Sequence, residues 1–525
     1  MKTTFLWMMA LALLAGCAKP KDSTEKATNP VIFADVPDVS MVRVGDVYYM
    51  ASTTMHMNPG LPIMKSTDLV NWELVSYAYD TLVANPKMNL TDSANAYGAG
   101  SWAPSIRFHE GLFYATTFSA TSGRTHVYTT TDPENVPWTG HSFEPMLHDH
   151  SLFFDDDAKV YMLYNGRDIR IVELEPDLSG IKEGGLHKEL IPEAGKVASE
   201  DLMLHAEGSQ LFKHDGKYYL FNITWPRNGM RTVIVHRADQ ITGPYEGRVA
   251  LQDRGIAQGC IIDTPEGDWY AYLFRDYGAV GRIPYIVPMK WENGWPVLGN
   301  NGIVPDTLDI AVKNINAAGI TASDEFERSA ASPDFPLAWQ WNHNPDNDFW
   351  SLNQRPGFLR LTNGRIDTDV LQARNTLTQR TFGPQSVAET AVELGGMKDG
   401  DFAGFIALQR NYGYVGVKME NGKKSLVMVL SENDEPIEKE LIPLATDRVY
   451  LKIACDFRER ADKAIFFYSL DAQDWKPIGD TLQMRYTLPH FMGYRFGLFS
   501  YATHETGGYV DFDYYRVDEG SSVLQ

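Results

Sequence analysis

Cysteine and positive charge are both scarce in this sequence of 525 residues, which has three Cys and 47 Lys and Arg against 68 Asp and Glu. The formal net charge of -21 argues against DNA, RNA and anionic membrane surfaces as partners, because such a surface would repel them. Cys260 and Cys455 lie far apart in apolar stretches, so we expect buried free thiols and no disulfide. CxxC, HExxH and P-loop patterns are also missing. A neutral ligand such as a sugar fits this composition better than a polyanion.

Long amphipathic helical patterns are missing as well, and a short strand pattern recurs in their place. A turn residue is followed by an aromatic or aliphatic residue and then Tyr, in GDVYYM, EGLFYATT, DAKVYMLY, DGKYYLFN and EGDWYAYL. The copies are roughly 45 to 65 residues apart, which is typical of propeller blades with loop insertions. Five copies predict five blades. We expect the five tyrosines to pack between neighbouring sheets: Tyr49, Tyr114, Tyr161, Tyr219 and Tyr270.

The N-terminus has the pattern of a targeting segment. Lys2 precedes an apolar run over residues 5–14, and Leu-Ala-Gly-Cys ends at Cys17. This resembles the lipobox of bacterial lipoproteins, which predicts a signal peptide over residues 1–17, lipidation of Cys17 and a polar, flexible tether over residues 18–29. A simple secretory peptide with an incidental Cys is the alternative. Since no acidic run follows Cys17, we expect a lipid-anchored protein of the cell envelope that faces the periplasm.

The repeats end near residue 300, and we place a domain boundary near residue 320. The segment 30–318 is therefore predicted to be a five-bladed β-propeller and catalytic domain. From residue 319 to 525 short alternating strands such as GFLRLTNG, DFAGFIALQR and KSLVMVLS are separated by polar turns. This series predicts a concanavalin-like antiparallel β-sandwich, so that the whole chain is all-β.

Three carboxylates stand out from the many acidic residues. Asp38 in DVPDVSMVRV, Asp149 in MLHDHSLFF and Glu207 in LHAEGSQLF each lie where a blade strand is expected to start, among small or apolar residues. The first residues of inner strands converge at one end of a propeller channel. Glycoside hydrolysis needs one carboxylic acid and one carboxylate across the sugar ring, and a third carboxylate nearby raises the pKa of the acid. The three residues are therefore candidate catalytic groups.

Several motifs in sequence order resemble glycoside hydrolase family 43 over residues 29–300: NPVIFADVPDVSMVRVGDVYYM, SWAPSIRFHEGLFYA, HDHSLFFDDDAKVYML, HAEGSQLFKHDGKYYL and GRIPYIVPMKWENGWPVL. The resemblance implies a five-bladed propeller and inversion of anomeric configuration. It also implies that Asp38 is the general base, Asp149 the pKa modulator and Glu207 the general acid. An inverting pair should be about 6.5 to 9.5 Å apart, so that a water fits between Asp38 and Glu207.

The same resemblance suggests three substrate-binding positions. Arg282 in VGRIP resembles an arginine that reaches toward sugar and acid, although a strand Arg is often a salt-bridge partner. Trp102 in SWAP resembles a subsite wall, with a core position as the alternative. Gln258 stands where many members have a His that helps to hold a central calcium ion. We therefore expect no required cofactor and no catalytic metal. Whether a structural calcium ion is bound stays open. The WAPS sequence also departs from the family at Ser105, so local hydrogen bonding should differ there.

The resemblance is to a subfamily rich in arabinofuranosidases and β-xylosidases with a C-terminal sandwich. That sandwich often sends a loop to close the pocket, for which LPHFMGYRFGLFSYATHETGG is our candidate. We expect exo-acting release of terminal α-L-arabinofuranose from hemicellulose side chains, in arabinoxylan or arabinosylated xyloglucan. The alternatives are a β-xylosidase or a dual enzyme, and a non-catalytic carbohydrate-binding lipoprotein. The expected partner is a hemicellulose-derived oligosaccharide, with no nucleic acid and no membrane contact beyond the lipid anchor.

Overall fold

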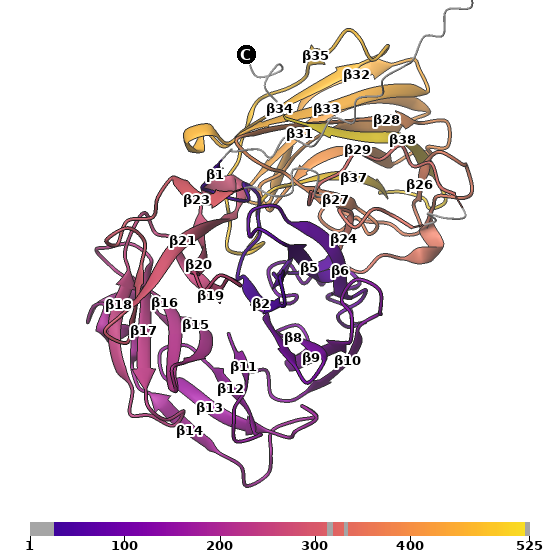
Figure 1. Ribbon diagram of the computed structural model, residues 1–525. Coiled ribbons are helices and arrows are strands. Elements are labelled where there is room, and N and C mark those ends of the chain that lie inside the picture. The colour runs from indigo at the N-terminus through magenta and orange to yellow at the C-terminus, as the bar shows by residue number, and fades with distance from the viewer. Residues whose placement is uncertain (1–25, 312–318, 330–333, 520–525) are drawn as a thin grey trace, which may run out of the picture.

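The computed structural model describes residues 26–311, 319–329 and 334–519, and it is built almost entirely from β-strands (Figure 1). Five four-stranded antiparallel sheets come first, and two larger sheets follow. Within these ranges the helical segments are four short 3-10 turns: η1 (Ala194–Val197), η2 (Gly278–Val280), η3 (Asn347–Phe349) and η4 (Arg458–Arg460). In the part of the chain that the structure describes, no helix is long and apolar enough to cross a membrane. The all-β prediction, a five-bladed propeller followed by a concanavalin-like sandwich, is confirmed.

Each blade is a four-stranded meander whose strands follow one another in sequence, except that β4 (Met57–Asn58) comes between the second and third strands of the first blade. The first blade has β2 (Ser40–Val44), β3 (Val47–Ala51), β5 (Gly60–Ser66) and β6 (Glu73–Tyr79). The second has β7 (Ser105–His109), β8 (Leu112–Ser119), β9 (Arg124–Thr130) and β10 (Thr139–Phe143). The third has β11 (Ser151–Phe154), β12 (Val160–Tyr164), β13 (Ile169–Leu174) and β14 (His187–Ile191). The fourth has β15 (Leu202–His214), β16 (Lys217–Pro226), β17 (Thr232–Ala238) and β18 (Glu246–Leu251), and the fifth β19 (Ala257–Asp263), β20 (Trp269–Asp276), β21 (Arg282–Glu292) and β22 (Trp295–Leu298).

The recurrent tyrosines mark the blades as predicted, because each one lies in the second strand of a different blade. Tyr49, Tyr161 and Tyr219 are buried, while Tyr114 and Tyr270 are half-buried. A Tyr in this position packs its ring between sheets and keeps its hydroxyl near polar partners at the rim. The repeat in the sequence therefore reports the packing of blade on blade.

Serine hydroxyls join the inner strands of neighbouring blades. The first strand of a blade is a sheet edge, and its N–H groups need partners because they face a narrow, buried channel. In three neighbouring pairs the N–H group of one inner strand donates to a fully buried serine hydroxyl on the preceding inner strand. The distances are 3.1 Å from Ile106 to Ser40, 3.1 Å from Leu152 to Ser105 and 3.0 Å from Leu211 to Ser151. Ser105, at which the WAPS sequence departs from the family, therefore accepts one of these hydrogen bonds between blades.

The folded body begins earlier than the sequence predicts. Residues 26–28 form β1 (Lys26–Thr28), which pairs with β23 (Thr307–Ala311). Ala27 is buried against the first blade, so these residues are not part of the tether expected over 18–29. The short polar sequence KAT did not predict a strand. The strand forms because Ala27 is buried and the backbone pairs with β23. Cys17 and the signal segment lie outside the described residues.

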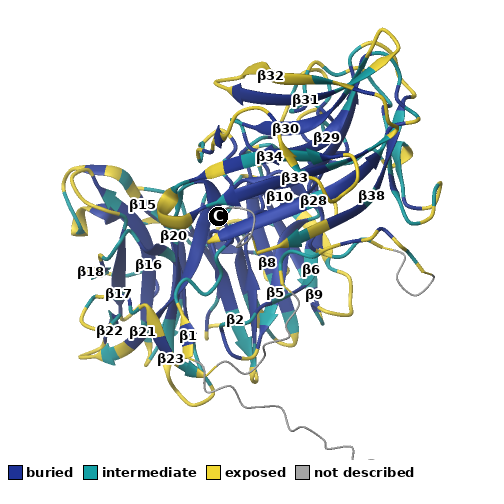
Figure 2. Ribbon diagram, turned by 90° about the horizontal axis from the view of Figure 1, so that it is seen from above, coloured by how far each residue is buried: buried dark blue, intermediate teal, exposed yellow. Residues whose placement is uncertain are grey.

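The C-terminal domain is a sandwich of two antiparallel sheets that packs against one side of the propeller (Figures 1 and 2). One sheet has the order β32 (Glu435–Leu444), β31 (Lys423–Glu432), β30 (Gly413–Glu420), β29 (Asp401–Leu408), β37 (Arg495–Ala502), β27 (Leu377–Arg380), β24 (Gln340–Asn342) and β4 (Met57–Asn58). The other has β25 (Trp350–Ser351), β26 (Leu359–Thr362), β38 (Tyr509–Asp518), β28 (Gln385–Glu393), β33 (Arg448–Asp456), β34 (Lys463–Ser469) and β35 (Lys476–Pro477), with β36 (Leu482–Gln483) beside β34.

The two domains share structure at their contact. Strand β4 comes from the first blade, yet it pairs with β24 and forms the edge of a sandwich sheet. Arg380 of the sandwich is fully buried and donates from Nε to the backbone carbonyl of Asp35 in the propeller.

Cys260 and Cys455 are buried and free, one in each domain, as predicted.

Candidate active site

The three predicted carboxylates come together at one end of the propeller channel. Asp38 and Asp149 line the same small cavity, and both are almost fully buried. Each lies two residues before its inner strand, β2 or β11, and each has a left-handed φ, of 54° and 45°. Such a backbone is uncommon for a residue other than Gly, and it aims the side chain across the channel.

Glu207 is placed differently from the other two acids. We expected it at the start of a strand, but β15 begins at Leu202, and Glu207 lies inside it where the pairing with β16 shifts register. A bulge of this kind turns a side chain out of the regular alternation. The Glu207 side chain is 29% exposed, against 7% for Asp149. It is therefore the acid with the most direct access to a bound substrate.

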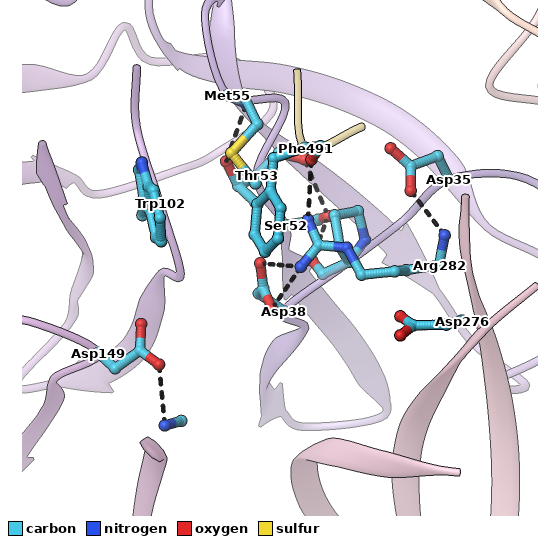
Figure 3. A network of polar contacts seen from close by, with 12 residues as sticks. Asp35, Asp38, Ser52, Thr53, Met55, Trp102, Asp149, Asp276, Arg282 and Phe491 are labelled. Carbon is cyan, nitrogen blue, oxygen red and sulfur yellow. Dashed lines mark hydrogen bonds and ion pairs between the residues drawn. The ribbon is translucent and has the colours of Figure 1, made fainter. Parts of the chain in front are cut away.

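Asp38 is held by Arg282, the first residue of β21. The Nη1 atom of Arg282 donates to both carboxylate oxygens, at 3.0 and 2.9 Å (Figure 3). Burial raises the pKa of the Asp38 carboxyl, while the Arg282 guanidinium opposes that shift. The backbone N–H of Arg282 donates to Asp35, which fixes the start of the strand. Arg282 therefore orients the predicted base, and the structure brings it into the site as expected.

Asp149 is tied to the residue that follows Glu207. Its Oδ2 atom accepts from the N–H of Gly208 at 2.9 Å, so the loop of one acid is fixed to the strand of the other. Burial raises the pKa of Asp149 to about 7, and the charges of Glu207 and Asp38 add to this shift. A carboxyl that titrates near neutral pH beside an acid is suited to modulate that acid.

Two residues of the site were not singled out by the sequence. His148 places Nε2 at 3.6 Å from Glu207 Oε2 and 3.9 Å from Asp149 Oδ2. Phe491 comes from the sandwich, just before β37, and stacks on Trp102 with ring centroids 5.4 Å apart and an interplanar angle of 22°. The signal for His148 was its place beside a candidate Asp in MLHDHSLFF. Phe491 lay within the segment expected to close the pocket, but nothing in its local sequence distinguished it.

Phe491 also contacts Arg282, which links the wall of the pocket to the base (Figure 3). The guanidinium lies 4.6 Å from the ring centroid, and its Nη2 atom donates to the Phe491 carbonyl at 3.4 Å. Trp102 is half-buried, and its ring faces the same space as Asp38 and Asp149. Aromatic rings beside convergent carboxylates form a site suited to one sugar ring.

Comparison with known proteins identifies the family. The model for glycosyl hydrolases family 43 matches residues 27–296, and the model for the beta xylosidase C-terminal concanavalin A-like domain matches residues 323–518. The chain belongs to glycoside hydrolase family 43. The family model describes glycosyl hydrolases, so the chain is a glycoside hydrolase.

Relatives in family 43 agree along most of the chain. A beta-xylosidase of Formosa agariphila is 29% identical over 93% of this chain and 90% of its own length. A non-reducing end alpha-L-arabinofuranosidase of Bacteroides ovatus is 26% identical over 81% of this chain and 82% of its own. A solved structure described as a bifunctional GH43-CE from Bacteroides eggerthii is 59% identical, with a TM-score of 0.92. That match covers 94% of this chain but only 64% of the solved one, so the other protein is longer.

The residues around Gln258 do not fit the central calcium ion found in many family 43 enzymes. Calcium takes six to eight oxygen ligands, most of them carboxylates, carbonyls and waters. Here the two cavity carboxylates are engaged, Asp38 by Arg282 and Asp149 by Gly208. The Gln258 side chain packs against Gly208, where an added Cβ would lie 2.8 Å from its amide carbon.

A positive charge already occupies the channel next to this cavity. Arg107 is half-buried there, and its guanidinium donates to Ser40, Ser151 and Gln210, the last of which lines the cavity. Burial lowers the pKa of Arg107 to about 10, which still leaves it charged at neutral pH. A guanidinium held at the axis would repel a divalent cation, so the arrangement disfavours calcium binding.

The wall formed by Phe491 predicts a change in substrate affinity. Replacing Phe491 by Ala removes the stack on Trp102 and the ring beneath Arg282, contacts that are each worth about 0.5–1.5 kcal/mol. We expect KM for a nitrophenyl pentoside to rise roughly tenfold, with a smaller loss in kcat. Leu488→Ala, at a side chain that is 71% exposed in the same segment, serves as the control. An unchanged KM in the Phe491 variant would show that this ring does not contact the sugar.

Proposed function

We propose that the protein is an exo-acting, inverting glycosidase that releases a terminal pentose, β-D-xylose in the first place, from xylan-derived oligosaccharides. The observation that carries this proposal is the group of three interacting carboxylates beside the stacked rings of Trp102 and Phe491, the second of which the sandwich contributes. A pocket closed on one side holds the end of a chain better than its middle. The position of Phe491 therefore favours exo over endo action.

In the proposed mechanism Asp38 removes a proton from the attacking water while Glu207 protonates the departing oxygen. The raised pKa of Asp38 makes it a stronger base than an exposed Asp, and Arg282 keeps its oxygens oriented. Asp149 modulates the Glu207 acid through its nearby charge, and it accepts a hydrogen bond from the backbone N–H of Gly208, the residue after Glu207. The attacking water lies between the Asp38 and Glu207 carboxyl groups. An inverting pair needs a wider gap between its two carboxyl groups than a retaining pair, because this water must fit between them.

Xylose takes first place in this proposal, whereas the sequence alone favoured α-L-arabinofuranose. Two relatives match more than four fifths of the chain. The one from Formosa agariphila, at 29% identity, is described as a "Beta-xylosidase", and the one from Xylanibacter ruminicola, at 30% identity, as a "Putative beta-xylosidase". Arabinofuranosidase activity, alone or with xylosidase activity, is the second candidate, supported by the Bacteroides ovatus relative. Both sugars use the same three carboxylates, so the choice depends on the pocket walls.

The test is sugar release from paired nitrophenyl β-D-xylopyranoside and α-L-arabinofuranoside. Faster release of xylose supports the proposal, and faster release of arabinose promotes the second candidate. No release from either compound, or from xylobiose, would contradict both and favour a carbohydrate-binding lipoprotein. The same assay on long xylan checks exo action, because an exo-enzyme releases single pentoses and no longer fragments.

Independence from calcium is a further expected property. Since the Arg107 guanidinium lies in the channel and Gln258 offers only an amide, we propose that no metal is needed. Activity after treatment with EDTA should stay within about 20% of its starting value, as should the melting temperature. Adding millimolar calcium should change neither quantity. A rise of several degrees in Tm with calcium would reveal a structural ion and contradict this proposal.

We also propose that the mature protein is anchored in the cell envelope by a lipid on Cys17 and faces the periplasm. The support is the Leu-Ala-Gly-Cys sequence after an apolar run. Cys17→Ser should move the protein from the membrane fraction to the soluble fraction and remove the mass of the lipid. An unchanged distribution would favour secretion by a signal peptide without lipidation.

A further inference from the structure

His148 lies beside the acids of two blades. It directly precedes Asp149, and its ring packs against Trp102 and Phe118, with centroids 6.3 and 5.1 Å apart. Its Nε2 atom is 3.6 Å from Glu207 Oε2, close enough for an ion pair. The side chain is 32% exposed, so the imidazole contacts the acids and also reaches solvent.

The second histidine that flanks Asp149 is of a different kind. His150 is buried, its Nδ1 contacts the Leu147 carbonyl at 2.9 Å, and its Nε2 contacts the Thr116 hydroxyl at 2.8 Å. Burial lowers the pKa of His150 to about 4, so it is neutral and structural at neutral pH. Of the two, only His148 is placed to exchange protons with solvent.

The charges that face His148 come from two elements. Glu207 approaches from β15 and Asp149 from the loop of His148 itself, while Trp102 and Phe118 bring no charge. Burial lowers the pKa of His148, but the contact with Glu207 and the charges of both carboxylates outweigh it and raise the pKa above its ordinary value. The His148 ring therefore holds a proton more tightly than an ordinary imidazole does, at a position beside Glu207.

An inverting reaction creates a need for such a proton. In each turnover Glu207 gives its proton to the leaving oxygen and becomes a carboxylate, while the proton of the water goes to Asp38. No covalent intermediate forms, so no later step of the same turnover returns a proton to Glu207. The acid must be reloaded from solvent before it can act again.

We propose that His148 is a positioning residue that holds the Glu207 carboxylate in place and returns a proton to it between turnovers. This inference rests on the proposed inverting mechanism. In the transfer the Nε2–H bond of the imidazolium breaks and an O–H bond forms on Glu207 Oε2. The neutral His148 then takes a proton from solvent, and Asp38 releases to solvent the proton that it removed from the attacking water, so that protons balance over the turnover. The distance of 3.6 Å closes by a small rotation of the Glu207 side chain, since catalytic contacts often tighten when substrate binds.

The kinetic test compares His148→Ala and His148→Gln with a control, His187→Gln, whose exposed ring lies in the outer strand β14. Substrates are xylobiose, whose leaving group needs a proton, and 2,4-dinitrophenyl β-D-xyloside, whose leaving group does not. We expect kcat on xylobiose to fall roughly 10- to 100-fold in both His148 variants, with little change on the activated compound. The limbs of the pH profile should move, and added imidazole should restore part of the activity of the Ala variant. Equal losses on both substrates without rescue would overturn the proposal.

A second measurement does not depend on activity. The pKa of His148 is followed by NMR in the wild-type protein and in Glu207→Gln, where the carboxylate charge is gone. We expect a value above the ordinary range in the wild type and a fall of at least half a unit in the variant. An unchanged value would overturn the coupling, whatever substrate the enzyme prefers. Failure of the wild type to cleave any pentoside would instead count against the proposed function, so the two outcomes are distinguishable.

Discussion

Replacing Asp38 by Ala is expected to lower kcat on nitrophenyl β-D-xylopyranoside by roughly 10²- to 10⁴-fold, the range that general-base catalysis contributes. The water then has no carboxylate to accept its proton, and the Nη1 atom of Arg282 loses the two carboxylate oxygens to which it donates. Because an unpaired buried guanidinium is costly, the melting temperature should also fall by several degrees. Initial rates and thermal unfolding on the same preparation measure both effects.

Asp38→Asn separates the loss of activity from the loss of stability. The Asn side chain has nearly the same volume as Asp and keeps one oxygen that can accept a hydrogen bond from Arg282. We expect it to be nearly as inactive as the Ala variant but closer to the wild type in stability. Azide, which attacks without a base, should restore turnover in the Ala variant and yield a glycosyl azide of inverted configuration. The control is Asp46→Ala, an exposed acid in the turn between β2 and β3, which should behave as the wild type. Near-normal activity in both Asp38 variants would remove Asp38 from the role of base.

Glu207→Ala is expected to divide substrates by their leaving group. Hydrolysis of xylobiose should fall by roughly 10³- to 10⁴-fold, because an alkoxide cannot depart without a proton. Hydrolysis of a dinitrophenyl xyloside should fall far less, since that phenolate leaves unaided. Measuring kcat/KM for a series of aryl xylosides should therefore give a steeper dependence on leaving-group pKa than in the wild type.

The matched control for Glu207 is Glu200→Ala, an acid that is 80% exposed and pairs with Lys196 on the surface. Its removal should leave all rates unchanged, because exposed pairs contribute little. Equal losses on xylobiose and on the dinitrophenyl compound in Glu207→Ala would show that Glu207 is not the proton donor. Asp149, whose pKa is raised to about 7, would then be the next residue to examine.

The blade repeat was predictable from sequence because its physical cause is local. Each tyrosine is the second-strand residue of a hairpin, and turn residues stand at fixed positions before it, as in DGKYYLFN around Tyr219. Asp38 and Asp149 were predictable for a similar reason, since each is followed two residues later by the serine that starts an inner strand. Glu207 was identified as a candidate but placed at the wrong point of its strand, because a bulge leaves no clear mark in alternation.

The remaining site residues depend on contacts between distant parts of the chain. Phe491 stacks on Trp102 across 389 residues of sequence, and the sequence near either ring does not indicate the other. His148 matters because its ring faces Glu207 in the next blade, a relation set by the closure of the propeller. Strand β4 has two residues and pairs with a strand of another domain, which no pattern of hydrophobicity could reveal. Contacts of this kind join residues that are far apart in the sequence, so the local sequence around either partner does not predict them.

The exchange of parts between the two domains has a consequence for synthesis and for evolution. When the ribosome has released residues up to 311, all five blades have been made, but β4 still lacks β24 and the pocket lacks Phe491. The nascent propeller is thus a folding intermediate with an unpaired edge, and activity should appear only once the segment before β37 has been translated. Recombination at the domain boundary would replace a pocket wall together with the sandwich. Shuffling of C-terminal domains among relatives would in this way change which sugar is accepted, without any substitution in the catalytic carboxylates.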